Sequence, residues 1–553
     1  MYTVGIDFGT LSARALLVDV RDGREVATSV FDYTHGVIDE RLPGSDRDLP
    51  PDWALQDPLD YIAAVKATVL AVLAESGIDP GEVIGLGIDF TACTMLPVKV
   101  DGTPLRTLEE WRGRPHAWVK LWKHHAGQPQ ADRINETARA RGEAWLRRYG
   151  GKISSEWFFA KALQILEEDP EVYHAADRLL EAADWVIWQL VGREVRNDCT
   201  AGYKAMVQDG NYPSREYFAA LHPEFADVVD EKMTREFAPL GARAGGLTEA
   251  MAEATGLRAG TAVAVANVDA HVTAPAVKAT GPGVMVMIMG TSTCHIVSGR
   301  ELQEVDGMCG VVDGGIIPGY YGYEAGQSGV GDIFAWFVDH AVPPEYHRAA
   351  ERAGLDLHAY LESEAARQGV GEHGLVALDW WNGNRSTLVD AELSGLLLGM
   401  TLATRPPDIY RALIESTAFG TREIIEAFET RGVPVEELIA AGGLPERNTL
   451  LRQIYADVTG RTFKLAGSAQ SPALGSAMHA AVAAGHYPDI AAAAESMGRL
   501  KDEVVTPNLE NRAVYEELYA EYRRLYDTFG RHGGAMKRLR RIRHDALARR
   551  HAA

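Results

Sequence analysis

Two aspartates stand where a strand-length apolar run gives way to a polar turn. Asp7 follows the run beginning at Val4, and Asp269 follows the run Val263 to Ala266 near the middle of the chain. A carboxylate in such a place can accept a proton from a hydroxyl group or hold Mg²⁺ through water. A lone aspartate at a strand end more often caps a loop or helix, so the surrounding sequence has to decide. Asp89 also follows a strand, and we interpret it as a cap or a supporting residue.

A strand that ends in Gly-Thr occurs twice, about half the chain apart. The first copy runs from Val4 to Thr10 and the second from Met285 to Ser292. Glycine in such a turn lets backbone N–H groups approach phosphate oxygens, and adjacent hydroxyl groups add donors. The donor hydroxyls are those of Thr10, Ser12, Thr291 and Ser292. Either copy alone is more typical of an ordinary hairpin, but one copy in each half predicts a two-sided grip on one polyphosphate.

Two further glycine-rich segments narrow the kind of nucleotide site. The segment Ala440 to Leu444 follows a strand, and its backbone would let an adenine or ribose lie close against it. The segment Gly326 to Gly331 comes near to a dinucleotide fingerprint, but its spacing is wrong and we see no clear strand before it. No GxxxxGK[ST] loop occurs. The sequence therefore favours neither a Rossmann oxidoreductase nor a P-loop protein.

Bulk properties exclude several classes of protein. The 553 residues are 46% hydrophobic and 24% charged, which is typical of a globular protein with two large domains. A net charge of −22 disfavours a nucleic-acid partner. The apolar runs are far shorter than the roughly 20 residues that span a bilayer, and no signal peptide is evident, so we expect a cytoplasmic protein without a membrane partner. The four cysteines are widely spaced, which predicts reduced thiols.

Strand-length and helical patterns alternate along the chain, which predicts a mixed α/β fold. The predicted strands are 2–6, 15–20, 83–88, 262–266, 284–288 and 438–441, and a helix with an apolar stripe is predicted from Tyr410 to Phe428. A Gly-Pro-Gly stretch at 281–283 suggests domains 1–278 and 279–535. The remaining residues, 536–553, carry seven Lys or Arg residues, and we expect a basic amphipathic helix that lies on the body of the protein.

Four segments together resemble the FGGY carbohydrate kinases, over nearly the whole chain. They are Gly5 to Thr10, Asn267 to His271, Gly290 to Thr293 and Ala441 to Gly443. The resemblance implies two actin-like (ribonuclease H-like) α/β domains with an interdomain cleft, the first holding the sugar and the second holding ATP. It implies that Asp269 is the catalytic base and that Asp7 and Asp269 lie near Mg²⁺. It also implies phosphate or adenosine contacts from Gly9, Thr10, Ser12, Arg14, Gly290, Thr291, Gly442 and Gly443.

Longer segments are similar to the branch of that family that phosphorylates L-ribulose at its terminal hydroxyl in arabinose breakdown. These segments are 121–125, 154–159, 202–206 and 323–328. By this resemblance the sugar would contact Ala92, Trp122, Lys204, Asp269 and Glu324. Lys204 offers a donor, Glu324 an acceptor and Trp122 an apolar face for C–H groups. Small residues from Ala92 to Thr94 replace the Arg-Glu pair of glycerol-type relatives, which leaves room for a five-carbon substrate.

Other interpretations of the same residues stay open. Without the resemblance, Trp122 is more typical of a packing residue, residues 157–159 are more typical of core, and the loop 379–385 has no assigned role. The substrate could be another ketopentose or a pentitol. An actin-like ATPase without a sugar substrate and a catalytically inactive sugar sensor are the competing functions. We expect ATP and L-ribulose as small-molecule partners, and a homodimer is the assembly to test.

Overall fold

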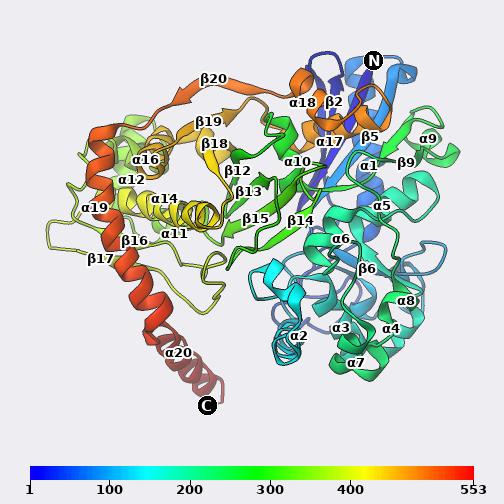
Figure 1. Cartoon of the computed structure of the whole chain (residues 1–553), viewed down its shortest axis with the longest axis horizontal. Coiled ribbons are helices and arrows are strands. Elements are labelled where there is room, and N and C mark those ends of the chain that lie inside the picture. Colours follow the sequence, from blue (N-terminus) through cyan, green and yellow to red (C-terminus); the bar gives the residue numbers. More distant parts are fainter. Residues whose placement is uncertain (553) are drawn as a thin grey trace.

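Each half of the chain forms a seven-stranded sheet in the computed structural model, which describes residues 1–552 (Figure 1). The order in the first sheet is β3-β2-β1-β5-β10-β9, and β11 also pairs with β5. Its strands are β1 (Tyr2–Phe8), β2 (Ser12–Asp19), β3 (Glu25–Asp32), β5 (Val83–Phe90), β9 (Arg243–Gly246), β10 (Ala262–Ala264) and β11 (Asn267–Val268). Strand β1 pairs antiparallel with β2 and parallel with β5. The Gly9-Thr10 turn therefore lies at the carboxyl end of a central strand.

The second sheet repeats this arrangement around its own Gly-Thr turn. Its order is β14-β15-β13-β12-β18-β19-β20. Its strands are β12 (Gly283–Met289), β13 (Thr293–Gly299), β14 (Gly310–Asp313), β15 (Tyr321–Gln327), β18 (Val435–Ala441), β19 (Thr462–Ala466) and β20 (Leu500–Val505). Strand β12 pairs antiparallel with β13 and parallel with β18, as β1 does with β2 and β5. The two turns thus occupy equivalent places in two similar sheets.

Helices and two small sheets surround these large sheets. In the first half they are α1 (Pro58–Ser76), α2 (Gln128–Arg141), α3 (Phe158–Glu168), α4 (Pro170–Ala175), α5 (Ala182–Val191), α6 (Asp198–Lys204), α7 (Arg215–Leu221), α8 (Val228–Lys232), α9 (Glu249–Thr255) and α10 (Asp269–Ala276), with β4 (Leu55–Gln56), β6 (Met95–Val98), β7 (Val119–Lys120) and β8 (Arg178–Glu181). In the second half they are α11 (Gly331–Ala341), α12 (Pro344–Ala353), α13 (Leu357–Ala365), α14 (Pro406–Thr430), α15 (Gly443–Arg447), α16 (Thr449–Thr459), α17 (Ser471–Ala483), α18 (Ile490–Met497), α19 (Leu509–Tyr526) and α20 (Ala535–Ala552), with β16 (Val376–Leu378) and β17 (Leu396–Leu398). Across residues 1–552, no helix combines the length and apolar character needed to cross a bilayer.

The predicted strands and the predicted long helix are confirmed, because their apolar residues are the ones that the structure buries. Val4 and Ile6 of β1 are fully buried, and so are Ile414 and Phe428 of α14. The start of α14 is fixed by Asp408, whose carboxylate accepts a hydrogen bond of 2.7 Å from the backbone N–H of Arg405. A carboxylate in the first helical turn satisfies an otherwise unpaired donor and complements the helix dipole.

Helices α10 and α17 connect the two halves through very close backbone contacts. A Cβ atom on Gly5 of β1 would lie 1.8 Å from the carbonyl oxygen of Ala473 in α17. A Cβ atom on Gly475 of α17 would lie 1.9 Å from the carbonyl oxygen of Val272 in α10. Only glycine permits such an approach. Because α17 comes from the second half of the chain and packs on the first sheet, the boundary between residues 278 and 279 stays a prediction.

The basic tail is helical, as predicted, but it does not lie on the body. Met536 is buried and the Lys537 ammonium lies 2.5 Å from Asp390, so the first turn of α20 is anchored. Beyond that turn, Leu539 and Ile542 are 66% and 57% exposed. Figure 1 shows α20 extending away from the rest of the chain. The expectation that the apolar residues of the tail pack against the protein is wrong. Its many cations keep the helix hydrated on nearly all sides.

Candidate active site

Strand pairing brings three aspartates together at the carboxyl end of the first sheet. Asp7 of β1 is directly opposite Asp89 of β5, and β11, which continues alongside β5, leads into α10 at Asp269. Ser476 of α17 donates a hydrogen bond of 2.6 Å to Asp89 Oδ2, whereas Asp89 Oδ1 is buried without a partner. Asp7 and Asp269 therefore lie near one another as predicted, and Asp89 is a member of their cluster rather than a simple cap.

Burial raises the pKa of all three carboxyl groups. For Asp269 burial is the largest cause, the charge of Asp7 adds to it, and the pKa reaches about 7 although a 2.7 Å bond from Ala270 N–H opposes the shift. Burial also raises the pKa of Asp7, against the opposing effects of a hydrogen bond with Asp89 and the charge of Arg14. Burial and then the charge of Asp7 raise the pKa of Asp89 well above its usual value. Ionisation of all three groups together is therefore unfavourable, and a further cation among them would make it easier.

The cluster suits a magnesium ion that arrives with a polyphosphate. Within residues 1–552 no group of three or more His, Cys, Asp or Glu side chains forms a ready-made metal cage. The unpartnered Oδ1 of Asp89 and the mutual repulsion of the carboxylates would both be relieved by a nearby hydrated cation. Mg²⁺ commonly keeps several waters and takes only one or two carboxylates besides substrate phosphates. The residues present therefore fit Mg²⁺, with Asp7 and Asp269 as the predicted neighbours.

The first hairpin is fixed by contacts that reach the predicted sugar residues. Gly9 N–H donates to Ser12 C=O at 3.0 Å and closes the turn. Gln56 donates to the carbonyl of Thr10 at 2.7 Å, and the indole N–H of Trp122 donates to Thr10 Oγ1 at 3.0 Å. In the ladder, Arg14 of β2 is opposite Asp7. The structure thus places Gly9, Thr10, Ser12 and Arg14 at the aspartate cluster and connects the hairpin to Trp122.

The second hairpin lies beside the start of two helices. Gly331 N–H donates to Gly290 C=O at 3.0 Å, which sets the amino end of α11 against the turn at Gly290 and Thr291. A Cβ atom on Gly290 would meet nothing within 4 Å, so this turn faces open space. Gly442 has a φ of 106°, and a Cβ atom there would lie 2.3 Å from Met289 C=O, so only glycine fits before α15, which starts at Gly443. Helix amino ends favour anions, as a phosphate site requires.

The segment Gly326 to Gly331 does follow a strand, so one reason for excluding a dinucleotide fold was wrong. Strand β15 ends at Gln327 and α11 begins at Gly331. The strand was missed because its sequence, from Tyr321 to Gln327, contains two glycines and few aliphatic residues. Strand β15 pairs antiparallel with both β13 and β14, whereas a dinucleotide fingerprint belongs to a parallel βαβ unit. The exclusion of a Rossmann site therefore stands on topology.

Lys204 and Glu324 meet across the two halves of the molecule. The ammonium of Lys204, at the end of α6, lies 3.0 and 2.9 Å from the two carboxylate oxygens of Glu324 on β15. His271 of α10 lies 3.1 Å from Glu324 Oε2. Burial alone would raise the pKa of Glu324 and lower that of Lys204, but their opposite charges reverse both shifts. The pair is therefore charged, and its two members act in opposite directions on Asp269, because the charge of Glu324 raises the pKa of Asp269 and the charge of Lys204 lowers it.

Lys161 supports two of the predicted sugar-contact segments, and the sequence did not reveal this role. Its fully buried ammonium donates to Cys93 C=O at 2.6 Å and to Leu121 C=O at 2.7 Å. These carbonyls belong to the residues next to Ala92 and Trp122, so one lysine holds both predicted sugar-contact segments. Nothing in the local sequence marks Lys161, because it lies in the apolar helix α3. The aromatic residues 157–159 beside it are buried, which confirms their interpretation as core.

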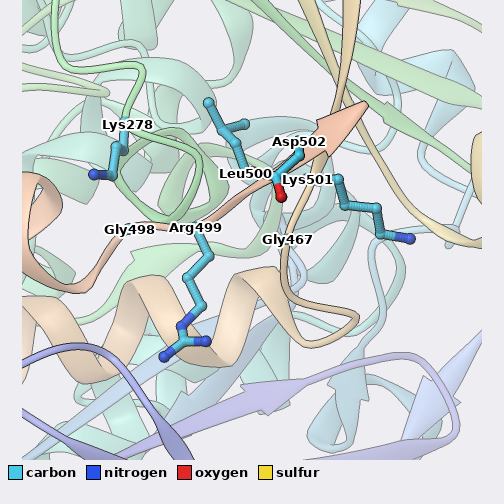
Figure 2. A pocket seen from close by; sticks show the side chains of 7 residues that line it. All are labelled: Lys278, Gly467, Gly498, Arg499, Leu500, Lys501 and Asp502. Carbon is cyan, nitrogen blue, oxygen red and sulfur yellow. The ribbon is translucent and has the colours of Figure 1, made fainter. Parts of the chain in front are cut away.

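A surface hollow elsewhere on the molecule has no part in this site. Its volume is about 590 Å³, and it is lined by residues that include Lys278, Arg499 and Lys501. Figure 2 shows these three basic side chains pointing in different directions rather than toward one ligand. Arg499 donates to the carbonyl of Gly23, which lies beyond the end of β2 that is opposite to the Asp7 end of the sheet. None of the candidate residues lines this hollow.

Two similar sheets, each with a glycine-threonine hairpin, and a cluster of buried carboxylates beside the first hairpin define a phosphotransferase of the two-domain sugar-kinase class. Models of the FGGY family of carbohydrate kinases match residues 2–275, as the N-terminal domain, and residues 285–484, as the C-terminal domain. The chain belongs to this family, as predicted. It is 58% identical over 549 residues to a ribulokinase of Mycolicibacterium smegmatis, covering 99% of this chain and 97% of that protein. It is 56% identical over 538 residues to a ribulokinase of Bacillus licheniformis, covering 96% and 98%.

Solved structures of related kinases have the same fold. The ligand-bound xylulose kinase from Lactobacillus acidophilus superposes with a TM-score of 0.79 at 17% identity, covering 97% of this chain and 99% of that one. The xylulose kinase from Rhodospirillum rubrum gives a TM-score of 0.77 at 22% identity, covering 96% and 99%. The predicted two-domain α/β fold class is therefore confirmed.

Proposed function

We propose that this protein transfers the γ-phosphoryl group of ATP to the terminal hydroxyl of L-ribulose, which yields L-ribulose 5-phosphate in L-arabinose catabolism. The observation that carries the proposal is identity of 56–58% to ribulokinases over nearly the full length of both chains. The positions of Lys204 and Glu324 near Asp269 support a polar substrate rather than water alone. At this identity a closely related sugar site is the natural expectation.

Asp269 is the proposed general base. It would accept the proton of the substrate hydroxyl as that oxygen attacks the γ-phosphorus, so that a better nucleophile forms during the transfer. Its pKa of about 7, raised by burial and by Asp7, suits a base that works near neutral pH. The N–H of Ala270 donates to Asp269 Oδ1 at 2.7 Å and orients the carboxylate, leaving the other oxygen for the substrate.

The two hairpins are the proposed phosphate clamp. Gly9, Thr10, Ser12 and Arg14 would contact the transferred end of ATP, while Gly290 and Thr291 hold the phosphates from the second half. Gly442 and Gly443 would receive the adenosine, where the left-handed turn keeps side chains away from the backbone. Mg²⁺ bound with ATP would supply positive charge to the phosphates near Asp7 and Asp269. Bringing the halves together around these groups would also exclude water, which competes with the sugar hydroxyl.

The sugar would lie between Trp122, Lys204 and Glu324. Lys204 can donate to hydroxyl or carbonyl oxygens, and Glu324 can accept from hydroxyl groups. Trp122, held by its bond to Thr10, offers a ring face to C–H groups. Ala92 leaves space that a larger side chain would fill. These contacts fit a ketopentose. The alternative to L-ribulose as the substrate is another ketopentose or a pentitol.

Measurement of ADP release across a panel of substrates tests the proposal. L-ribulose should give the highest kcat/KM among L-ribulose, D-ribulose, D-xylulose, L-xylulose, ribitol and glycerol. A higher kcat/KM for another ketopentose or for ribitol would show that the substrate is a different one, while the proposed phosphoryl transfer would still hold. ATP hydrolysis that no sugar stimulates, together with polymer formation in light scattering, would favour the ATPase alternative. Tight sugar binding without ADP release would favour a sugar sensor.

We also propose a cytoplasmic location and a homodimer, as expected from the sequence. The location follows from dependence on ATP as co-substrate. Fractionation of cells checks it, and recovery of the protein with membranes or outside the cell would contradict it. Light scattering coupled to size-exclusion chromatography checks the assembly, because a dimer has twice the mass of the 60.2 kDa chain.

A further inference from the structure

The loop between β16 and β17 brings an arginine to the sugar side of the molecule. A Cβ atom on Gly326 would lie 2.8 Å from Cδ of Arg385, so the arginine stem lies directly on β15. The N–H of Gly326 donates to Oγ of the next residue, Ser386, at 3.2 Å. Glu324 is two residues away on the same strand and therefore points to the same face of the sheet as Gly326. The loop that had no assigned role thus places Arg385 beside the Lys204–Glu324 pair.

A carboxylate from the first half faces this arginine. Nη2 of Arg385 lies 3.7 Å from Oε1 of Glu156, whose side chain is 17% exposed. Glu156 precedes Trp157, and the ring of Trp157 lies 5.4 Å from the ammonium of Lys204. At its outer side Glu156 Oε1 also lies 3.8 Å from Nε2 of His125, which is 46% exposed. Two charge pairs therefore lie next to each other, and each takes one member from each half.

The two pairs differ in how closely their members approach. Lys204 and Glu324 are in hydrogen-bond contact at 2.9 Å, whereas Arg385 and Glu156 remain 3.7 Å apart, beyond the hydrogen-bond range. Across the described residues, 1–552, the guanidinium of Arg385 makes no hydrogen bond, although its side chain is only 34% exposed. A guanidinium has five N–H donors, and leaving them unpaired in a partly buried place is unfavourable. An ion pair this long adds little stability by itself.

We propose that Arg385 and Glu156 bind one hydroxyl group of the substrate between them and so help to select a ketopentose. A hydroxyl group can accept a hydrogen bond from the guanidinium and donate one to the carboxylate at the same time. A methylene group can do neither. In this proposal the bridged hydroxyl is not the terminal hydroxyl that reacts at Asp269. The proposal rests on the proposed function, because it extends that sugar site to a second pair of polar residues.

Steady-state kinetics of Arg385→Ala and Glu156→Gln test the proposal. Each change should raise the KM for L-ribulose about 10- to 100-fold, as expected for loss of a hydrogen bond to a charged group. The KM for ATP should stay within about twofold, and the double variant should lose less than the product of the single effects, because one hydroxyl serves both residues. Arg215→Ala is the matched control, since the guanidinium of Arg215 makes an exposed 2.6 Å pair with Asp227.

Ketopentose analogues that each lack one hydroxyl group give a second measurement. A variant that had merely lost folding stability would not give the same pattern of results. For the analogue that lacks the bridged hydroxyl, wild type and Arg385→Ala should have the same kcat/KM, whereas the other analogues that keep the reacting terminal hydroxyl should still distinguish them. A KM for L-ribulose within about twofold of wild type in Arg385→Ala would overturn the inference while leaving the kinase intact. A wild type that turns over no ketopentose would instead overturn the proposed function, and with it this extension.

Discussion

The two Gly-Thr hairpins have the same strand pairing but different chemical surroundings. Each closes with a backbone bond from its glycine, at 3.0 Å from Gly9 to Ser12 and 2.9 Å from Gly290 to Ser292. The residue three positions before the threonine is Asp7 in the first hairpin and Ile288 in the second hairpin. The first therefore belongs to a cluster of buried acids, whereas the second faces open space beside the start of α11.

The phosphate-binding turn and the proton chemistry are therefore separate properties of the fold. A tight turn of backbone N–H groups can be repeated, because it needs only glycine and a strand pair. Three carboxylates in one buried place are costly, because burial disfavours each charge and each charge disfavours the others. The molecule carries this cost on one side only, next to the proposed site of phosphoryl transfer.

Removing the proposed base should have the largest effect. Asp269→Asn should lower kcat by about 10²- to 10⁴-fold, the usual contribution of a general base, while the affinity for ATP changes little. ADP release and ATP titration measure the two quantities. Asp339→Asn, at an exposed position of α11, is the matched control and should behave as wild type. A kcat near that of wild type in Asp269→Asn would show that the base is elsewhere.

Removing the acid of the first hairpin should weaken magnesium dependence. Asp7→Asn keeps the size of the side chain but loses its charge, and we expect a 10- to 100-fold loss in apparent Mg²⁺ affinity or in activity. Mg²⁺ titrations of the reaction rate at saturating ATP and sugar measure it. Unaltered Mg²⁺ dependence would mean that the two hairpins do not differ in the way described.

A methyl group on the second hairpin should affect ATP but not folding. Gly290→Ala has space for its Cβ, so the free energy of unfolding should change by no more than about 0.5 kcal/mol. The KM for ATP should nevertheless rise about 5- to 10-fold, because the methyl group lies where phosphates approach the backbone. Gly113→Ala, which also has nothing within 4 Å, serves as the control. An unchanged KM for ATP would place the phosphates elsewhere.

The smallest predicted effect is the pH dependence of kcat/KM that the aspartate cluster causes. Asp269 acts as a base only when ionised, so kcat/KM should fall as pH drops through its pKa of about 7 and level off above it. Because the charge of Asp7 raises this pKa, Asp7→Asn should shift the midpoint to lower pH. Rates from pH 5.5 to 8.5 check both statements. A midpoint that stays the same in Asp7→Asn would contradict the proposed electrostatic contact.

Much of the fold could be read from the sequence because it depends on local patterns. The strands near Val4, Leu86 and Met285 and the helix ending near Phe428 are apolar at the spacing that burial requires, and they are found where predicted. The strand before Gly326 was missed because its residues pack through tyrosines and glycines rather than aliphatic side chains. The tail was misplaced because an amphipathic pattern indicates a helix but does not specify a surface to receive it.

The two hairpins, the acids beside the first hairpin and the resemblance to sugar kinases could all be inferred from the amino-acid sequence. Each of these is a property of a few consecutive residues, so residue type and spacing are sufficient. The tertiary structure alone decided that Asp89 joins Asp7, that Lys161 holds two segments, and that Lys204, Glu324, Glu156 and Arg385 meet across the two halves. Those residues are far apart in the chain, and only the packing of different helices, strands and loops against one another brings them together.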